Sequence, residues 1–367
     1  MPTAFNPIQL GDRTLKNRIV MSPMTRSRAY GPDSSPTDDM VAYYSQRAGA
    51  GMIVTEGTQP SVIGQGYPNT PGLHSDAQVR AWRRVTNAVH AEDGVIFAQL
   101  MHTGRIGHPS IYTHPQVPVG PSAVRAAGQI FTTAGMQDFV VPRELTSAEI
   151  ERTIEDFVVA ARNAISAGFD GVELHGANGY LLHQFLSTNA NQRTDDWGGS
   201  PLNRVRLVIE TTRAVADAIG ASRTALRLSP ANSLNDMVED DYRETYPLVL
   251  SALDNLELAY LHVLESRDPE FTAVLRQAWS GVFMLNPATP GSHTGPEHLA
   301  LIETGAADLV SFGRLFIANP DLPERLMIGA PLATPDMTKA YGGDSHGYSD
   351  YPTMHEPAHQ PTLASVQ

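Results

Sequence analysis

The chain has 367 residues, of which 41% are hydrophobic, and this is enough for a large buried core. Its formal net charge of −13 and its pI of about 5.4 argue against a nucleic-acid or anionic-membrane partner, because both need a basic face. The absence of cysteine excludes disulfides, thiolate nucleophiles, iron–sulfur clusters and cysteine-ligated zinc. The first residues show neither a signal peptide nor a bilayer-spanning run, so we expect a cytoplasmic protein.

Short apolar runs alternate with longer segments of helical period, which is the pattern of repeated βα units. The helices have recognisable ends. Thr146 and Glu149 cap the start of one helical period, which stops at Gly168, and Pro296 opens another that closes at Gly305. Strands are predicted at residues 18–24, 51–57, 95–102, 171–177, 224–230, 258–266, 282–287 and 307–314.

These strands are apolar on both faces, which favours an α/β fold with a closed parallel barrel, the single (β/α)8 TIM barrel. An open doubly wound sheet is the alternative, but it would normally carry a glycine-rich phosphate-binding turn after its first strand. Gly49 and Gly51 begin such a pattern, but Val54 stands where the third glycine belongs, and the run precedes a strand.

Residues 103–145 interrupt the alternation, because they are rich in proline, glycine, histidine and threonine and lack a long helical period. A connection of this length inside a barrel is usually functional. We expect this excursion after the third strand to cover the active-site face as a capping subdomain or lid. One barrel domain would then span residues 1–354, followed by a flexible C-terminal tail at residues 355–367.

Polar and mostly uncharged side chains follow the predicted strands, and in a parallel barrel these strand ends form the active-site face. The paired carboxylates of a glycosidase and the close His-x-His of a barrel metallohydrolase are missing, so we predict no metal site. The amide of Gln99 can donate and accept, as a flavin pyrimidine edge requires, and Arg227 could stabilise negative charge on a reduced ring. Gly313 and Arg314, at a strand-to-helix junction, could hold a phosphate.

Two neutral donors, His175 and Asn178, follow the fourth strand and can converge on one carbonyl oxygen. Polarising that oxygen would make the β-carbon of a conjugated alkene electrophilic, and the donors would then stabilise the enolate. Tyr180, two residues further on, could deliver a proton to the α-carbon.

Structural roles are the alternatives at such positions. A histidine at a strand end and a tyrosine near a helix start often serve packing, and Arg227 could equally be an ion-pair partner. We interpret His183, inside an apolar helix, as a packing residue. Asp195 and Asp196 are interpreted as loop carboxylates that fix a turn.

Several long motifs resemble those of the Old Yellow Enzyme family, in its classical branch. They are NRIVMSPMTRSR near the start, QLMHTGR in the third strand, GFDGVELHGANGYLLHQFLSTNANQRTDDWGGSPLNR around the fourth, DLVSFGRLFIANPDLPERL in the eighth and GYSDYP near the end. The similarity covers residues 4–354. The family is a (β/α)8 barrel that binds FMN at the C-terminal ends of its strands. The resemblance therefore implies an FMN-dependent NAD(P)H oxidoreductase.

The resemblance also implies a ping-pong reaction and roles for individual residues. Hydride would pass from NADPH or NADH through FMN to the β-carbon of an α,β-unsaturated carbonyl or nitro compound. His175 and Asn178 would bind the carbonyl, and Tyr180 would protonate the α-carbon. The protein would act on small activated alkenes as a monomer or homodimer. FMN contacts would come from Pro23, Met24, Thr25, Gly57, Gln99, Arg227, Gly291, Gly313 and Arg314, and the substrate pocket would be lined by Tyr67, Met101 and Tyr341.

Some positions depart from the family pattern. Met101 stands where relatives often carry tryptophan, and Asn178 is a histidine in some of them, so both should influence substrate preference. The segment LNPATPGSH around Gly291 differs from the usual glycine-rich phosphate loop. Two rival functions are a metal-dependent barrel hydrolase or aldolase, for which His102 and His175 lack partner acids, and a flavoprotein that binds FMN without turnover.

Overall fold

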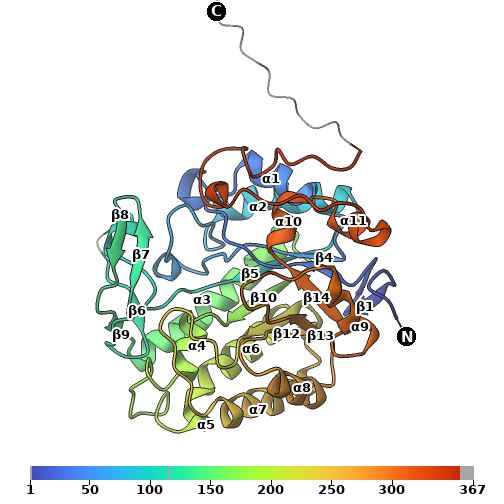
Figure 1. The fold of residues 1–367 in the computed structure, drawn as a ribbon. Coiled ribbons are helices and arrows are strands. Elements are labelled where there is room, and N and C mark those ends of the chain that lie inside the picture. The colour runs from blue at the N-terminus through green and yellow to red at the C-terminus, as the bar shows by residue number, and fades with distance from the viewer. Residues whose placement is uncertain (1, 115, 356–367) are drawn as a thin grey trace, which may run out of the picture.

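The computed structural model describes residues 2–114 and 116–355, and in it eight parallel strands close into a barrel in the order β10-β11-β12-β13-β14-β3-β4-β5 (Figure 1). All eight predicted strands are present, and their side chains are almost entirely buried because the barrel interior is packed and helices cover the outside. The strands are β3 (Ile19–Met21), β4 (Met52–Val54), β5 (Ile96–Leu100), β10 (Gly171–Gly176), β11 (Thr224–Leu228), β12 (Tyr260–Leu264), β13 (Phe283–Asn286) and β14 (Leu309–Phe312).

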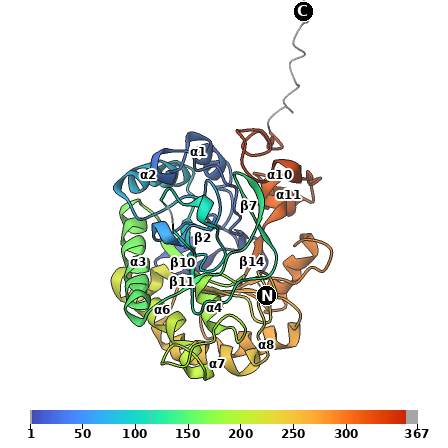
Figure 2. The ribbon, with the colours of Figure 1, turned by 90° about the vertical axis from the view of Figure 1, so that its left-hand side faces the viewer.

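Helices form a ring around these strands (Figure 2). The predicted cap of the helix after the excursion is confirmed, since the Thr146 N–H donates to Glu149 Oε2 at 2.9 Å and the Glu149 N–H donates to Thr146 Oγ1 at 3.3 Å. The α-helices are α1 (Asp38–Ser45), α2 (Asp76–Ala91), α3 (Ser147–Ser166), α4 (Leu181–Leu186), α5 (Pro201–Arg204), α6 (Arg206–Ile219), α7 (Tyr242–Leu253), α8 (Pro269–Ala278), α9 (Ala300–Glu303), α10 (Arg314–Ala318) and α11 (Leu322–Ile328). Short 3-10 helices are η1 (Pro32–Ser34), η2 (Val62–Gly64), η3 (Pro109–Ile111), η4 (Ala221–Arg223), η5 (Asp254–Leu256), η6 (Pro296–Leu299) and η7 (Met337–Lys339).

A hairpin that the sequence analysis did not predict closes one end of the barrel. Its strands are β1 (Ile8–Leu10) and β2 (Arg13–Leu15), and they pair antiparallel. Leu10 and Leu15 pack into a buried cluster with residues from the beginnings of the barrel strands. Figure 1 shows β1 and the hairpin of the excursion at opposite ends of the molecule, so the strand ends that carry the candidate site lie on the excursion's side.

The excursion contains four short strands: β6 (Val119–Gly120), β7 (Gln129–Thr132), β8 (Gly135–Asp138) and β9 (Arg143–Glu144). β7 and β8 form a hairpin, and β6 pairs with β9. Its small apolar cluster, which includes Ile106, Ile130 and Phe139, packs against Tyr67 and Tyr180. The excursion therefore lies over the strand end that carries Tyr180, as predicted, while its action as a lid stays a prediction.

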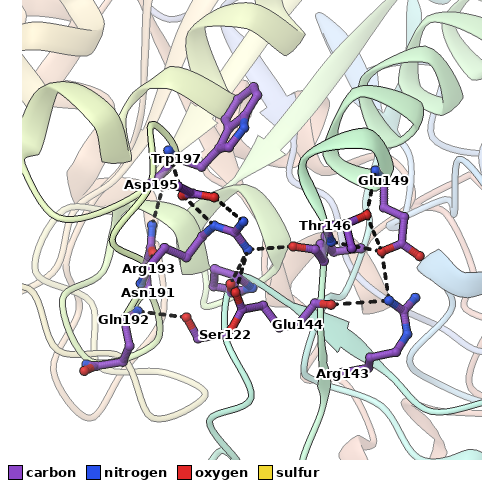
Figure 3. A network of polar contacts seen from close by, with 12 residues as sticks. Ser122, Arg143, Glu144, Thr146, Glu149, Asn191, Gln192, Arg193, Asp195 and Trp197 are labelled. Atoms are coloured by element: carbon purple, nitrogen blue, oxygen red, sulfur yellow. Dashed lines mark hydrogen bonds and ion pairs between the residues drawn. The ribbon is translucent and has the colours of Figure 1, made fainter.

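Arg193 ties the loop after α4 to two separate segments of the excursion (Figure 3). Its guanidinium donates to the carbonyl oxygens of Pro121 at 2.9 Å and of Leu145 at 2.6 Å. It also pairs with Asp195, which accepts the backbone N–H of Trp197 at 3.1 Å. The interpretation of Asp195 as a carboxylate that fixes a turn is thus confirmed.

The irregular segment after α11 is firmly attached to the start of the barrel. The ring of Tyr348 stacks on that of Tyr43, with centroids 4.0 Å apart and an interplanar angle of 9°. Arg26 lies over the Tyr348 ring at 4.9 Å and donates through Nε to the carbonyl oxygen of Ala340 at 2.8 Å. Buried guanidinium groups and stacked rings therefore hold this segment in place.

The predicted flexible tail, residues 355–367, lies outside the described residues except for His355, whose Nε2 is 3.0 Å from Glu324 Oε1. The assignment of residues 1–354 to a single domain stays a prediction. Within the described part of the chain, no helix combines the length and apolar content that crossing a membrane requires. The cytoplasmic location stays a prediction as well.

Candidate active site

A cavity of about 410 Å³ opens at the C-terminal ends of the barrel strands. Side chains reach it from the ends of β3, β11, β12, β13 and β14 and from the loop that follows β10. It is the edge of a parallel barrel at which active sites are built. Eight of the residues predicted to form the site line this cavity: Pro23, Met24, Thr25, Asn178, Arg227, Gly313, Arg314 and Tyr341.

The other predicted residues, apart from Gly291, lie next to this cavity or pack against one another at the same strand ends. A side chain added at Gly57 would come within 2.4 Å of Met101 Cε, so the Met101 side chain covers that glycine. The rings of His175 and Tyr180 are in edge contact, with centroids 5.1 Å apart. Gly291 does not line the cavity. It lies at φ +73° in the loop between β13 and η6, and its contact with a phosphate stays a prediction.

His175 is buried, with 3% of its surface exposed, and its side chain makes no hydrogen bond with any of the described residues. Its register partner on β11 is Arg227. Burial lowers the pKa of His175 well below its usual value, and the positive charge of Arg227 lowers it further. The imidazole is therefore neutral, and its ring nitrogens are available to a ligand.

Asn178 follows β10 in the left-handed backbone region, at φ +58°, which asparagine tolerates better than most residues. Its N–H donates to Ser229 Oγ at 2.9 Å, and its carbonyl oxygen accepts from Asn235 Nδ2 at 2.7 Å. The loop after β11 therefore fixes the Asn178 backbone.

Tyr180 immediately precedes α4, and its hydroxyl lies 3.1 Å from that of Tyr67. Burial raises the pKa of Tyr180, which outweighs the effect of its hydrogen bonds to Tyr67 and Asn235. The phenol therefore keeps its proton, as a general acid must.

A buried polar chain crosses the barrel behind the cavity, and the sequence analysis missed most of it. Gln99 Nε2 donates to Glu173 Oε1 at 2.8 Å, and His262 Nδ1 lies 2.8 Å from Glu173 Oε2. His262 Nε2 is in turn 3.0 Å from Ser311 Oγ. Because a carboxylate only accepts, the amide oxygen of Gln99 must face away from Glu173. In the sequence, these residues are marked only as polar side chains inside otherwise apolar strands, Glu173 in β10 and His262 in β12.

Arg227 supplies a positive charge that acts on Glu173, the centre of this row of hydrogen-bonded side chains. Burial raises the pKa of Glu173, but the neighbouring His262, the hydrogen bonds and Arg227 outweigh it, so the pKa is below its usual value. Arg227 Nη2 donates to Asn286 Oδ1 at 3.2 Å, while its buried Nε has no partner in the described residues. Arginine stays protonated even when buried, so the ionised Glu173 and the charged Arg227 influence each other electrostatically inside the barrel.

The interpretation of His183 as packing is incomplete. His183 is fully buried, but its Nδ1 accepts the N–H of Gly179 at 2.8 Å and its Nε2 lies 3.0 Å from Glu239 Oε2. Glu239 also accepts the hydroxyl of Tyr246 at 2.9 Å. Glu239 is distant from His183 in sequence, so the pairing is visible only in the structure, where the loop after β11 brings Glu239 next to His183.

The residues at this site fit FMN. Arg227 Nε is a buried polar atom without a partner in the described residues, and it lies at a strand end where the ring system would be held. A Cβ at Gly313 would approach nothing closer than 3.5 Å, so a side chain there would fill the cavity that the glycine leaves open. Arg314 is exposed and has no ion-pair partner within the described ranges, which leaves its guanidinium available for a phosphate.

The closed barrel, with neutral donors and arginines at its strand ends, defines the class of flavin-dependent barrel oxidoreductases. The chain belongs to the NADH:flavin oxidoreductase / NADH oxidase family, whose model matches residues 3–333. It is 41% identical over 361 residues to a probable flavin mononucleotide-dependent alkene reductase of Leishmania infantum, a match that covers 95% of this chain and 97% of that relative.

Solved structures lead to the same family. The old yellow enzyme homologue of Zymomonas mobilis superposes with a TM-score of 0.91 at 40% identity, covering 96% of this chain and 99% of the other. Morphinone reductase in complex with tetrahydroNAD gives a TM-score of 0.90 at 41% identity, covering 98% and 99%. The Old Yellow Enzyme resemblance, the barrel, the oxidoreductase class and FMN with NADPH or NADH as hydride donor are thereby confirmed. The hydrolase or aldolase alternative is not supported, and the described residues contain no cluster of three metal-binding side chains.

Proposed function

We propose that this enzyme reduces the C=C bond of α,β-unsaturated carbonyl or nitro compounds. His175 and Asn178 hold the substrate oxygen, and Tyr180 protonates the α-carbon. The observation that carries the proposal is the edge contact of the His175 and Tyr180 rings, 5.1 Å between centroids, next to the cavity that Asn178 lines. Donors for an oxygen and a source of a proton thus lie side by side, as a conjugate reduction requires.

The oxygen-binding pair acts by stabilising charge that develops during the reaction. As the β-carbon is reduced, negative charge grows on the substrate oxygen, and neutral donors in a buried site stabilise it strongly. Burial keeps His175 uncharged, so it binds a carbonyl or nitro oxygen without attracting unrelated anions. Removing one such donor from other enzymes lowers kcat by roughly 10²–10³-fold.

The cofactor and the remaining residues complete the site. FMN, when bound, supplies the redox chemistry by taking two electrons from NADPH or NADH and passing them to the alkene. Gln99 would present its amide oxygen to the pyrimidine edge, Arg227 would balance negative charge there, and Gly313 and Arg314 would hold the phosphate. Pro23, Met24, Thr25 and Gly57 would contact the ring, and Tyr67, Met101 and Tyr341 would shape the space for the alkene.

The test is an anaerobic absorption experiment on the purified, FMN-loaded protein. We expect NADPH or NADH to bleach the flavin bands and 2-cyclohexenone to restore them, with 2-cyclohexen-1-ol as the matched compound that lacks a carbonyl. Bleaching that no enone or nitroalkene reverses would contradict alkene reduction and support the rival function, FMN binding without turnover.

A further inference from the structure

We propose that Asn232 is a positioning residue that turns the amide of Asn178 so that its NH2 group faces the ligand. The site would then accept ligands that present an oxygen acceptor at this position, such as a carbonyl or nitro oxygen. This inference rests on the proposed function, because it explains why Asn178 presents a hydrogen-bond donor to the substrate oxygen. Both asparagines line the cavity.

The orientation of Asn232 is fixed by the backbone of its own loop. The N–H of Leu234, which can only donate, bonds to Asn232 Oδ1 at 2.9 Å. This is the turn in which an asparagine side chain accepts from the main chain two residues further on. The amide oxygen of Asn232 is therefore turned to Leu234, and its NH2 group points the other way.

That NH2 group then fixes Asn178. Asn232 Nδ2 donates to Asn178 Oδ1 at 3.2 Å, so the oxygen of Asn178 is used on the side of the loop. The Nδ2 of Asn178 is left without a partner in the described residues. The opposite rotamer of Asn178 would bring two NH2 groups together, and both are donors only.

The backbone of Asn178 is held in place, so it cannot move to compensate for a turned amide. Its N–H and carbonyl oxygen are bound by Ser229 and Asn235, so the backbone is held and the soft coordinates are the side-chain torsions, chiefly the rotation of the terminal amide. Among the described residues, Asn232 alone supplies a side-chain hydrogen bond to that amide. The identity of residue 232 therefore decides whether Asn178 offers a donor or an acceptor to the cavity.

The test is Asn232→Asp in the FMN-loaded protein, read with the neutral substrate 2-cyclohexenone. The new carboxylate can still accept from Leu234, but it needs a donor from Asn178, so the amide turns and its oxygen faces the cavity. We expect the KM for the enone to rise by about tenfold or more, as for a hydrogen bond replaced by a repulsive contact. The dissociation constant of FMN should not change. Ser233→Ala, in the same loop, is the matched control and should leave both values unchanged.

A double-mutant cycle separates orientation from a direct effect of the new charge. In an Asn178→Ala background, Asn232→Asp should raise KM less than about twofold, because no amide remains to be turned. An equal rise in both backgrounds, or no rise in the single variant, would overturn the inference. The proposed function fails on a different result, which is an Asn178→Ala variant with unaltered enone kinetics.

Discussion

The hydroxyl of Tyr67 lies 3.1 Å from the hydroxyl of Tyr180, and the two rings stand at 88° to each other. Burial raises the pKa of both phenols, that of Tyr67 well above its usual value. Both therefore stay protonated, and Tyr67 holds the Tyr180 hydroxyl in one position. A proton donor that is fixed and neutral is what the second half of an alkene reduction needs.

Tyr180→Phe should slow reoxidation of the reduced flavin by 2-cyclohexenone by roughly 10²–10⁴-fold, the usual contribution of a general acid. Reduction of the flavin by NADPH should be unchanged, because that step needs no proton from this residue. Stopped-flow absorption measures the two half-reactions separately. Slower flavin reduction with normal reoxidation would remove Tyr180 from this role.

Tyr67→Phe is the matched control for that experiment. It removes the hydroxyl that fixes Tyr180 but leaves the Tyr180 proton in place. We expect a smaller loss of the alkene half-reaction, about tenfold or less, consistent with one lost hydrogen bond. A loss as large as that of Tyr180→Phe would mean that the two phenols act as one donor.

The double variant His175→Ala with Asn178→Ala should retain FMN, because neither side chain is assigned to the cofactor. Binding of a phenolic ligand such as 4-hydroxybenzaldehyde should weaken strongly, and enone turnover should fall by at least roughly 10²-fold. Titration of the flavin spectrum and steady-state rates measure the two effects. Turnover that stays at the level of the unmodified protein would contradict the assignment of His175 and Asn178 to the substrate oxygen.

Glu173→Gln should destabilise the protein, because Arg227 would remain buried without its ionised counterpart. Glu173 also accepts a hydrogen bond from Gln99 and contacts His262, and a hydrogen bond to a charged group is typically worth about 1.5–3 kcal/mol. Ser311→Ala, which removes the far end of the same chain of contacts but no charge, should cost only about 1 kcal/mol. Urea unfolding of the two variants gives the comparison, and equal losses would show that the charge of Glu173 contributes little.

Glu56 gives the fold a pH dependence of its own. It is 1% exposed and accepts the N–H of Arg26 at 3.2 Å, and burial raises its pKa to about 7. Between its ordinary value of 4.5 and about 7, the folded chain holds a proton that the unfolded chain has released. The contribution of Glu56 to stability therefore falls as pH rises through this window, by up to about 1.4 kcal/mol per pH unit.

Glu56→Gln lacks this titration, so its stability relative to the unmodified protein should improve between pH 5 and pH 7 and level off above. Melting temperatures of both proteins at several pH values test this. Taking the difference between the two cancels the groups that titrate in both. A difference that stays constant from pH 5 to pH 8 would mean that Glu56 is already ionised at pH 5.

The barrel could be predicted because each strand is a short apolar run between turn signals, and this local pattern survives in the structure. The β1–β2 hairpin and the strands of the excursion could not, because they are short and do not form continuous apolar runs. Their pairing depends on contacts with distant parts of the chain, such as those that Arg193 makes with the excursion.

The same distinction applies to the candidate site. The residues that end strands, such as Gln99 and Arg227, could be identified because a barrel brings all strand ends to one face. The partners that orient them could not: His262 looks like an isolated polar residue in a strand, and Asn232 like an ordinary loop residue. Their roles depend on segments that are distant in sequence and meet only in the folded chain. No local sequence pattern therefore indicates these roles.

The cavity takes Pro23 and Thr25 from near the beginning of the chain and Met337 and Tyr341 from near its end. The barrel also closes between β3 and β14, the first and last of its strands. During synthesis, when the chain leaves the ribosome from the N-terminus, this cavity stays incomplete until Tyr341 has emerged. Chains that stop before this point lack one wall of the cavity, so we expect flavin absorbance to distinguish them from chains in which the cavity is complete.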